Sequence, residues 1–106
     1  IINISSGAGT RGFPTNAPYS AAKAGIIALT QAFAGEVRDK GLLVNVVCPG
    51  PINTDMHATR PEDGFLSNDS VFLDPIDVAD TVLFLASPLA GRTTAQIFHV
   101  RNSDRW

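Results

Sequence analysis

The pattern that most constrains the fold of this chain is an alternation of short apolar runs with segments of helical periodicity. The apolar runs are Ile1–Ser5, Leu42–Cys48 and Ala95–Val100, and the second of them is also rich in β-branched residues, as buried strands are. Two helical patterns separate these runs, one over 18–40 and one that begins at Asp74. The order strand, helix, strand, helix, strand predicts an α/β fold, a parallel sheet with right-handed crossovers.

The first helical segment carries two different stripes. Apolar residues at helical spacing predict a face buried against the sheet: Ala22, Ile26, Leu29, Phe33 and Val37. Small residues form the other stripe: Ala21, Gly25, Ala28, Ala32 and Gly35. We interpret the second stripe as a covered face, which predicts a homodimer or homotetramer through the 18–40 helix. An ordinary alanine-rich solvent face is the alternative, since alanine is the best helix former. Gly41 is expected to end this helix.

The second helical segment has clear start signals. Asp74 suits the N-cap and Pro75 the first helical position, and Asp77 and Asp80 would lie near the positive end of the helix dipole. Pro88 is expected to mark its end. The apolar positions predict a buried stripe: Ala79, Val82, Leu83 and Ala86.

Composition excludes several classes of protein. The 106 residues are 44% hydrophobic, which is enough for one modest core, and 8 Lys plus Arg against 10 Asp plus Glu show no basic footprint for nucleic acid or an anionic membrane. Cys48 is a single cysteine, and no Cys/His spacing suggests a metal site, so we expect a reducing, cytoplasmic location. No run is long enough to span a bilayer. Because the chain opens at Ile1 with an apolar strand under way, we interpret it as a fragment of a longer protein.

Two residues of the 18–40 helix form a candidate acid–base pair. Tyr19 and Lys23 lie four apart, so their side chains share one face about one turn apart. A lysine charge beside a phenol favours the phenolate, which would make the tyrosine a usable general acid or base. Taken alone, the spacing also fits two residues that merely decorate a helix surface.

Ser6 follows the first predicted strand, at the sheet edge where open α/β folds place their ligand crevice. A hydroxyl at this point could hydrogen-bond a carbonyl oxygen and stabilise the negative charge that develops there. A turn serine that bonds its own backbone is the alternative. The small residues after it predict a flexible loop.

Three segments together resemble successive motifs of the short-chain dehydrogenase/reductase family: Asn3–Ser6, Tyr19–Gly25 and Val44–Thr54. Their order and spacing agree with the family, in which the catalytic serine precedes the tyrosine by about thirteen positions, and this selects Ser6 rather than Ser5. The segment 77–87 is similar to the last helix of the family, so the resemblance covers nearly the whole chain.

The resemblance implies a Rossmann-like doubly wound parallel sheet, of which this chain is the C-terminal part, and an oxidoreductase that interconverts an alcohol and a carbonyl with NAD or NADP. The implied catalytic residues are Ser6, Tyr19 and Lys23. The implied cofactor contacts are Tyr19, Lys23, Pro49, Gly50, Ile52 and Thr54. The implied substrate contacts are Ser6, Tyr19 and Met56. In this reading residues 1–106 are the C-terminal part of one NAD(P)-binding domain, and the glycine-rich phosphate loop of the family belongs before Ile1.

The chain departs from the family pattern near its end. Thr94–Gln96 stands where threonine, glycine and glutamine are usual, and Arg101–Ser103 stands where an aspartate and two glycines are common, so we expect an atypical C-terminal turn.

The resemblance also implies that segment 56–73 is a loop that sets substrate choice, although its apolar residues could simply pack a lid onto the domain. A non-catalytic nucleotide-sensing or scaffold module, or an inactive fragment, remains the alternative function.

Overall fold

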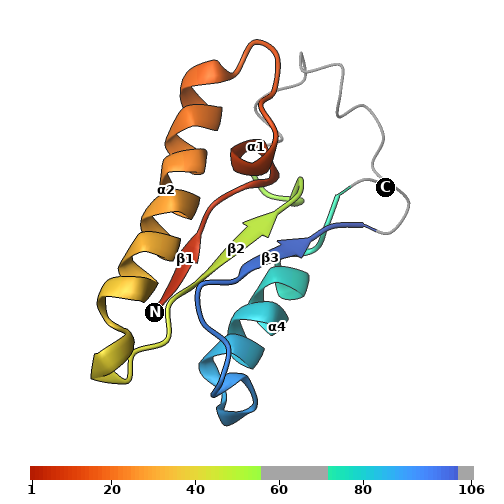
Figure 1. The fold of residues 1–106 in the computed structure, drawn as a ribbon. Helices are drawn as coiled ribbons and strands as arrows, with labels where there is room; N and C mark the ends of the chain where they lie inside the picture. The colour runs from red at the N-terminus through yellow and green to blue at the C-terminus, as the bar shows by residue number, and fades with distance from the viewer. Residues whose placement is uncertain (56–71, 103–106) are drawn as a thin grey trace.

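A computed structural model of the chain describes residues 1–55 and 72–102. Three strands, β1 (Ile2–Ile4), β2 (Asn45–Pro49) and β3 (Ile97–Val100), form a parallel sheet in the order β1-β2-β3. Figure 1 shows them side by side, with β2 between the other two. The predicted order of elements and the parallel pairing are confirmed, and the strand bounds differ from the predicted ones by three residues or fewer.

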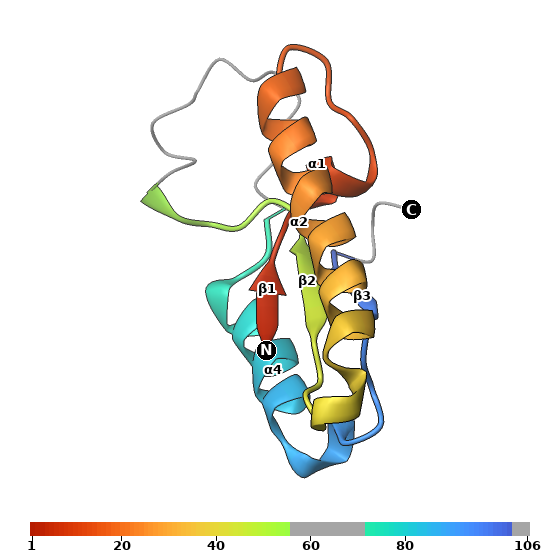
Figure 2. The same cartoon turned by 60° about the vertical axis from the view of Figure 1, so that its left-hand side comes forward.

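Two long helices, α2 (Ala17–Glu36) and α4 (Pro75–Ala86), cover the sheet. The side chains of β2 are buried throughout and alternate between the helices: Val46 and Cys48 pack with Ile27 of α2, whereas Val47 packs with Leu85 of α4. Because successive side chains of a strand point to opposite faces, the two helices lie on opposite faces of the sheet. Figures 1 and 2 show α2 on one side of the strands and α4 on the other, which is the doubly wound arrangement.

Helix α2 buries a different face from the predicted one. Of the predicted stripe Val37 alone is buried, and Leu29 is 63% exposed. The residues that α2 buries are Ser20, Ile27, Thr30 and Ala34. Thr30 can lie against the sheet because its hydroxyl accepts a hydrogen bond from the Asn3 side chain (2.9 Å) and donates one to the Ile26 carbonyl (2.7 Å). Because these polar groups bond one another, they can be buried against the sheet. The buried face of α2 is therefore shifted by about one residue along the sequence from the face that hydropathy predicts.

A 3-10 turn and a glycine follow the end of α2. A single 3-10 turn, η1 (Arg38–Lys40), follows the helix, and Gly41 then takes a left-handed φ of 69° that ends it. Such a conformation is easy for glycine because glycine has no Cβ. Gly41 thus ends the 3-10 turn, whereas the α-helix itself ends at Glu36, four residues before the predicted end at Lys40.

Helix α4 begins as expected, with Asp74 at the N-cap, Pro75 in its first turn and the Asp77 carboxylate accepting a hydrogen bond from the Asp74 backbone N–H (2.9 Å). The predicted buried stripe is wrong, since Leu83 is 69% exposed and Leu85 is the buried residue. Val78 and Val82 are partly buried beside it. The helix is apolar on several faces, so periodicity alone does not select the one against the sheet. A 3-10 turn, η3 (Pro88–Ala90), follows.

The register of β3 against β2 is held by a buried amide. Asn45 is 2% exposed; its Nδ2 donates to the Thr93 carbonyl (2.8 Å) and its Oδ1 accepts from the Gln96 N–H (3.1 Å). Between these two points Ala95 takes a φ of 59°, in the left-handed region. This is the position where the resemblance expects glycine, so the atypical turn predicted there has a concrete form: an alanine in a backbone conformation that favours glycine.

No helix in the described part of the chain is long and apolar enough to cross a membrane.

Candidate active site

Ser6 lies just beyond β1, at the carboxyl edge of the sheet. The residue is half-buried and is the N-cap of α1 (Gly7–Thr10), a single helical turn where the sequence predicted a flexible loop. Its Oγ accepts a hydrogen bond from the Ala8 N–H at 3.2 Å. The local backbone bond of a turn serine is therefore present. A serine hydroxyl also carries a proton that it can donate, so capping α1 leaves Ser6 able to bond a carbonyl oxygen.

Tyr19 and Lys23 come to the same edge from the first turns of α2. The Lys23 ammonium nitrogen lies 5.7 Å from the centroid of the Tyr19 ring and donates a hydrogen bond to the Ile4 carbonyl, the last residue of β1, at 3.4 Å. Tyr19 is 44% exposed, so its ring is open to solvent on one side. A phenol, an ammonium and the end of β1, two residues before Ser6, thus meet at one place.

Ser5 and Gly9 fit α1 tightly against the turn of α2 that carries Lys23. The buried Ser5 hydroxyl donates to the Lys23 carbonyl oxygen at 2.7 Å. A Cβ at Gly9 would lie 2.7 Å from the Lys23 carbonyl carbon, 2.8 Å from its oxygen and 2.8 Å from the Ser5 Oγ. These distances leave no room for a side chain at Gly9. The sequence analysis gave neither residue a role. The feature that could have indicated this close contact is a glycine three residues after Ser6.

The end of β2 brings two of the expected cofactor contacts to this edge. Pro49 is buried, and the Gly50 N–H donates to the Val100 carbonyl at 2.8 Å. A Cβ at Gly7 would lie 3.6 Å from the Pro49 carbonyl oxygen, so this end of β2 lies directly beside α1. Pro49 and Gly50 are therefore neighbours of the turn that Ser6 caps.

The other expected contacts lie further along the chain. Ile52 is half-buried and forms a parallel bridge with Leu73, in which the Asn53 N–H donates to the Leu73 carbonyl (2.9 Å) and the Leu73 N–H to the Pro51 carbonyl (2.8 Å). Thr54 is exposed. Met56, the expected substrate contact, and most of the predicted substrate loop lie outside the described residues.

Cys48 lies under this edge and is fully buried. Burial raises the pKa of its thiol, and hydrogen bonds with the Ser5 side chain and the Ser6 backbone partly offset that rise. A protonated, inaccessible thiol is a poor nucleophile, so Cys48 is a small core residue. In residues 1–55 and 72–102 no group of three or more His, Cys, Asp or Glu side chains could hold a metal ion.

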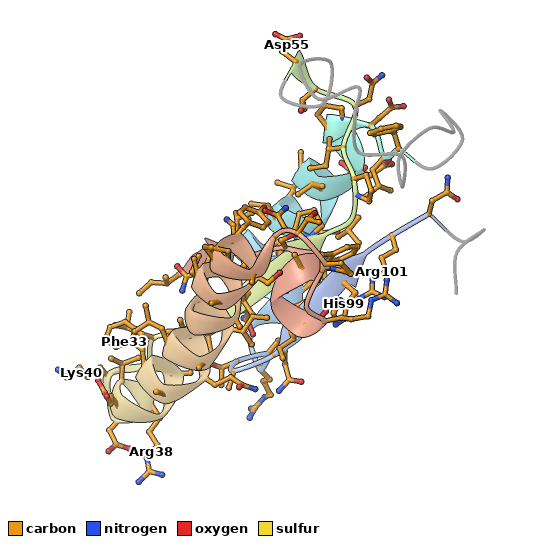
Figure 3. The ribbon with its side chains drawn as sticks, turned by 90° about the horizontal axis from the view of Figure 1, so that it is seen from above. Phe33, Arg38, Lys40, Asp55, His99 and Arg101 are labelled. Carbon is orange, nitrogen blue, oxygen red and sulfur yellow. The ribbon has the colours of Figure 1, made fainter. Side chains whose placement is uncertain are left out.

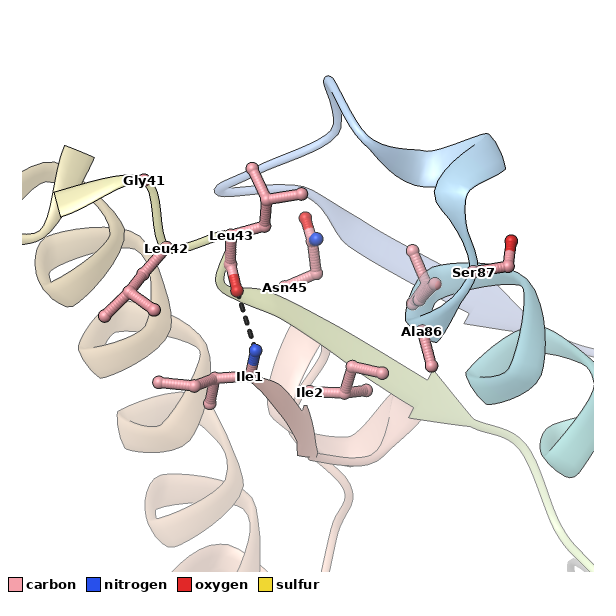
Figure 4. Close-up of a pocket in the computed structure, with 9 residues that line it drawn as sticks. Ile1, Ile2, Gly41, Leu42, Leu43, Asn45, Ala86 and Ser87 are labelled. Atoms are coloured by element: carbon pink, nitrogen blue, oxygen red, sulfur yellow. Dashed lines mark hydrogen bonds between the residues drawn. The ribbon is translucent and has the colours of Figure 1, made fainter. Parts of the chain in front are cut away.

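A hollow of about 360 Å³ lies away from this site, near the amino end of the sheet (Figure 4). The residues lining it are Ile1, Ile2, Gly41, Leu42, Leu43, Asn45, Leu85, Ala86 and Ser87. The backbone amine of Ile1 donates to the Leu43 carbonyl across it at 2.7 Å. None of the predicted site residues lines this hollow.

Comparison with known proteins gives the family. The family model described as Enoyl-(Acyl carrier protein) reductase matches residues 1–102. A 3-oxoacyl-[acyl-carrier-protein] reductase of Vibrio harveyi is 43% identical over 105 residues, covering 94% of this chain and 43% of that protein. Nodulation protein G of Azospirillum brasilense is 41% identical over 105 residues, with the same coverage of both chains. The chain thus spans less than half the length of these curated relatives.

Solved structures with a similar fold and sequence support the same family. The actinorhodin polyketide ketoreductase with NADPH is 33% identical, superposes with a TM-score of 0.86 and is matched over 96% of this chain and 45% of its own. A 4-hydroxyisoleucine dehydrogenase complexed with NADH is 28% identical with a TM-score of 0.77, over 94% of this chain and 43% of its own. The fold and the edge site define the Rossmann-like α/β class. Within that class, the chain belongs to the short-chain dehydrogenase/reductase family.

Proposed function

We propose that this chain forms the catalytic part of an oxidoreductase that interconverts an alcohol and a ketone or aldehyde by hydride transfer with NAD or NADP. The observation that carries the proposal is the contact of the Lys23 ammonium with both the Tyr19 ring and the last carbonyl of β1, the strand that Ser6 follows by two residues. Similarity to ketoreductases and dehydrogenases described with NADPH or NADH supports the same reaction class.

Each of the three side chains has a distinct part in the proposed reaction. The Ser6 hydroxyl donates a hydrogen bond to the substrate oxygen and so stabilises negative charge on it. Tyr19 gives its phenolic proton to that oxygen during reduction and takes it back during oxidation. The Lys23 ammonium, 5.7 Å from the ring centroid, attracts the negative charge that this proton transfer leaves on Tyr19.

The side chains proposed as cofactor contacts have the chemistry to hold the nicotinamide end of the cofactor. The Lys23 ammonium and the Tyr19 hydroxyl can bond ribose hydroxyls, and the Thr54 hydroxyl can bond a carboxamide or a nearby phosphate. The chain at Pro49, Gly50 and Ile52 would line the ring. When bound, the cofactor supplies or accepts the hydride, while the protein supplies orientation and the proton.

The test replaces Tyr19 with phenylalanine in the full-length protein. We expect oxidation of NADPH or NADH with a 3-oxoacyl ester to fall by at least about 100-fold, because an acid–base group is lost. Cofactor binding, followed by fluorescence titration, should stay within a few-fold of wild type. Gln31→Ala, at an exposed position of the same helix, is the control for general disturbance of α2.

Three other results have different meanings. Retained turnover in Tyr19→Phe would overturn the mechanism. A wild-type protein that binds the cofactor but reduces no carbonyl compound would favour a nucleotide-binding module without catalysis. A wild-type protein that does neither would favour an inactive product.

We further propose that the protein self-associates, as a homodimer or homotetramer, through the small-residue face of α2. All five members of the stripe (Ala21, Gly25, Ala28, Ala32 and Gly35) are exposed, and so is Leu29 beside them. A face without large side chains lets a second helix approach closely. Ala28→Arg should shift sedimentation toward monomer, whereas Asp39→Lys, beyond the helix end, should not; an unchanged Ala28→Arg profile would contradict this interface.

A further inference from the structure

Three successive residues at the end of β1 form hydrogen bonds to α2. The Asn3 side chain donates to the Thr30 hydroxyl at 2.9 Å, and the Ser5 hydroxyl donates to the Lys23 carbonyl oxygen at 2.7 Å. Between them, the Ile4 carbonyl accepts a hydrogen bond from the Lys23 ammonium at 3.4 Å. Asn3 and Ser5 have no part in the proposed reaction, although both belong to the first of the three segments that resemble family motifs.

The spacing of the two side-chain bonds matches on the strand and the helix. Asn3 and Ser5 are two apart on the strand, so both side chains point to the face that α2 covers. Ile2, the residue before them, packs on the other face with the core under α4. Lys23 and Thr30 are seven apart on the helix, which is about two turns, so both lie on the side of α2 that faces β1. Side-chain bonds therefore hold α2 against β1 at two points.

Directional bonds set the position of a helix more sharply than apolar packing does. Apolar burial has no preferred direction, whereas a hydrogen bond weakens steeply when its distance or angle leaves a narrow range. Ser5 is 4% exposed and Thr30 is fully buried, so a shift of α2 along β1 would leave buried hydroxyls without these partners. In residues 1–55 and 72–102 every buried side-chain nitrogen or oxygen has a hydrogen-bond partner. The position seen in the structure is therefore the one that the polar groups select.

The position of α2 along β1 also decides where its side chains lie relative to Ser6. Ser6 directly follows Ser5 and caps α1, and Figure 3 shows α1 beside the first half of α2, seen from above. Tyr19 and Lys23 both belong to α2. A shift of this helix would therefore move the phenol and the ammonium together, away from the serine hydroxyl, without removing any of the three groups.

We propose that Asn3 and Ser5 are positioning residues of the proposed active site. By holding α2 at two points, they set the distance of the Tyr19 hydroxyl and the Lys23 ammonium from the Ser6 hydroxyl. This inference rests on the proposed function and adds to it the groups that align its three side chains. A misplacement of about 1 Å between reacting groups can cost on the order of 100-fold in rate, so contacts at some distance from the chemistry can control turnover.

The test uses the bond between Asn3 and Thr30, which lies about two turns of helix from Lys23. In the full-length protein with its cofactor, Asn3→Leu combined with Thr30→Val replaces both polar partners with apolar groups of similar shape, a change that is close to neutral for stability. We nevertheless expect kcat per folded molecule, with a 3-oxoacyl ester, to fall by about threefold to tenfold. The KM for the ester should change by less than about twofold, because no substrate contact is removed.

Matched variants separate positioning from a merely structural role. Thr30→Ser keeps the hydroxyl that Asn3 bonds and should keep kcat within about twofold of wild type. Thr81→Val removes from α4 a hydroxyl that donates to the Asp77 carbonyl of its own helix at 3.3 Å, and should leave kcat unchanged. Ser5→Ala loses the bond nearest the site and should lower kcat the most, by about tenfold or more.

The possible results separate this inference from the proposed function. If the wild-type protein reduces the ester and the double variant is equally active, the positioning role is overturned and the oxidoreductase proposal stands. A kcat that is low in Thr30→Val alone but normal in the double variant also overturns it, because the loss then comes from an unpaired amide. If the double variant does not fold, Ser5→Ala decides: a lowered kcat per folded molecule supports the role, and an unchanged one overturns it.

A structural measurement decides if the wild-type protein reduces no carbonyl compound. Crystal structures of the wild type and of the double variant then show whether α2 has shifted along β1. A Lys23 that is displaced relative to Ser6 supports the positioning role. A Lys23 that keeps its wild-type place overturns it.

Discussion

The two ends of the sheet differ in how well the small residue found there fits its backbone position. At the carboxyl end, Gly9 lies where even one added carbon would come within 2.8 Å of the Lys23 backbone. At the amino end, Ala95 takes a φ of 59°, a conformation in which glycine would be less strained. A hollow of about 360 Å³ also lies near that amino end, whereas α1 and α2 are in close contact at the other. Close fit is thus concentrated beside the proposed site of Ser6, Tyr19 and Lys23.

Replacing Gly9 with alanine is the strongest test of this difference. The new Cβ would press on backbone atoms of Lys23, which cannot move without shifting α2 or α1. We expect the free energy of unfolding, measured by urea denaturation of the full-length protein, to fall by about 1 to 3 kcal/mol. Turnover should fall as well, because the Lys23 ammonium shifts with its backbone.

Gly12 provides the matched control for that substitution. A Cβ at Gly12 would meet nothing within 4 Å, so Gly12→Ala in the same connection should leave stability and turnover close to wild type. If Gly9→Ala behaves like Gly12→Ala, the contact between α1 and α2 is not as tight as the distances indicate.

Removing the Ser5 hydroxyl should have a smaller effect of the same kind. Ser5→Ala loses a buried 2.7 Å hydrogen bond to the Lys23 carbonyl, for which we expect a loss of about 1 kcal/mol in unfolding free energy. Ser87 at the other end of the sheet makes an equally short bond to the Phe84 carbonyl, so Ser87→Ala is a natural comparison. Turnover should drop in Ser5→Ala only; an equal drop in both variants would show that stability, not alignment, is being measured.

Ala95→Gly should have the smallest effect, with the opposite sign. Relief of the left-handed strain should raise the unfolding free energy by about 0.5 to 1 kcal/mol. Loss of the contact between the Ala95 methyl group and the core would make this gain smaller. Turnover should not change. Ala79→Gly, in the regular part of α4, should instead lower stability by about 1 kcal/mol. Thermal unfolding of the two variants side by side checks the sign, and destabilisation by Ala95→Gly would contradict the strain.

The order of elements could be predicted from the sequence because each element carries local signals. Apolar β-branched runs mark the strands, and Asp74, Pro75 and Gly41 mark helix ends. Parallel pairing then follows from the alternation of strands with helices. The strand positions and helix starts could be predicted because their signals lie in residues close together in the sequence.

The helix faces could not be predicted in the same way. Thr30 is fully buried because it bonds Asn3, a partner 27 residues away that hydropathy does not reveal. Leu83 is exposed although it is as apolar as the buried Leu85, since α4 offers several apolar faces and the position of the sheet selects one.

For the candidate site, motif and spacing predict Ser6, Tyr19 and Lys23, and this assignment stays a prediction; the structure places Ser6 just after β1 and the Lys23 ammonium at the last carbonyl of the same strand. The supporting contacts of Ser5 and Gly9 were missed because they depend on how closely two backbones approach.

The buried amide of Asn45 has a consequence for how the chain reaches its native state. Its two bonds go to residues 48 and 51 positions later, so neither can form until the segment just before β3 has been made. During synthesis, β2 must therefore remain without its β3 neighbour while more than forty further residues are made, with the hydrogen-bonding edge of a strongly apolar strand unprotected. We expect the pairing of β2 with β3 to be a late step of folding, and the period before it to be the one in which this chain is most exposed to aggregation and most dependent on chaperones.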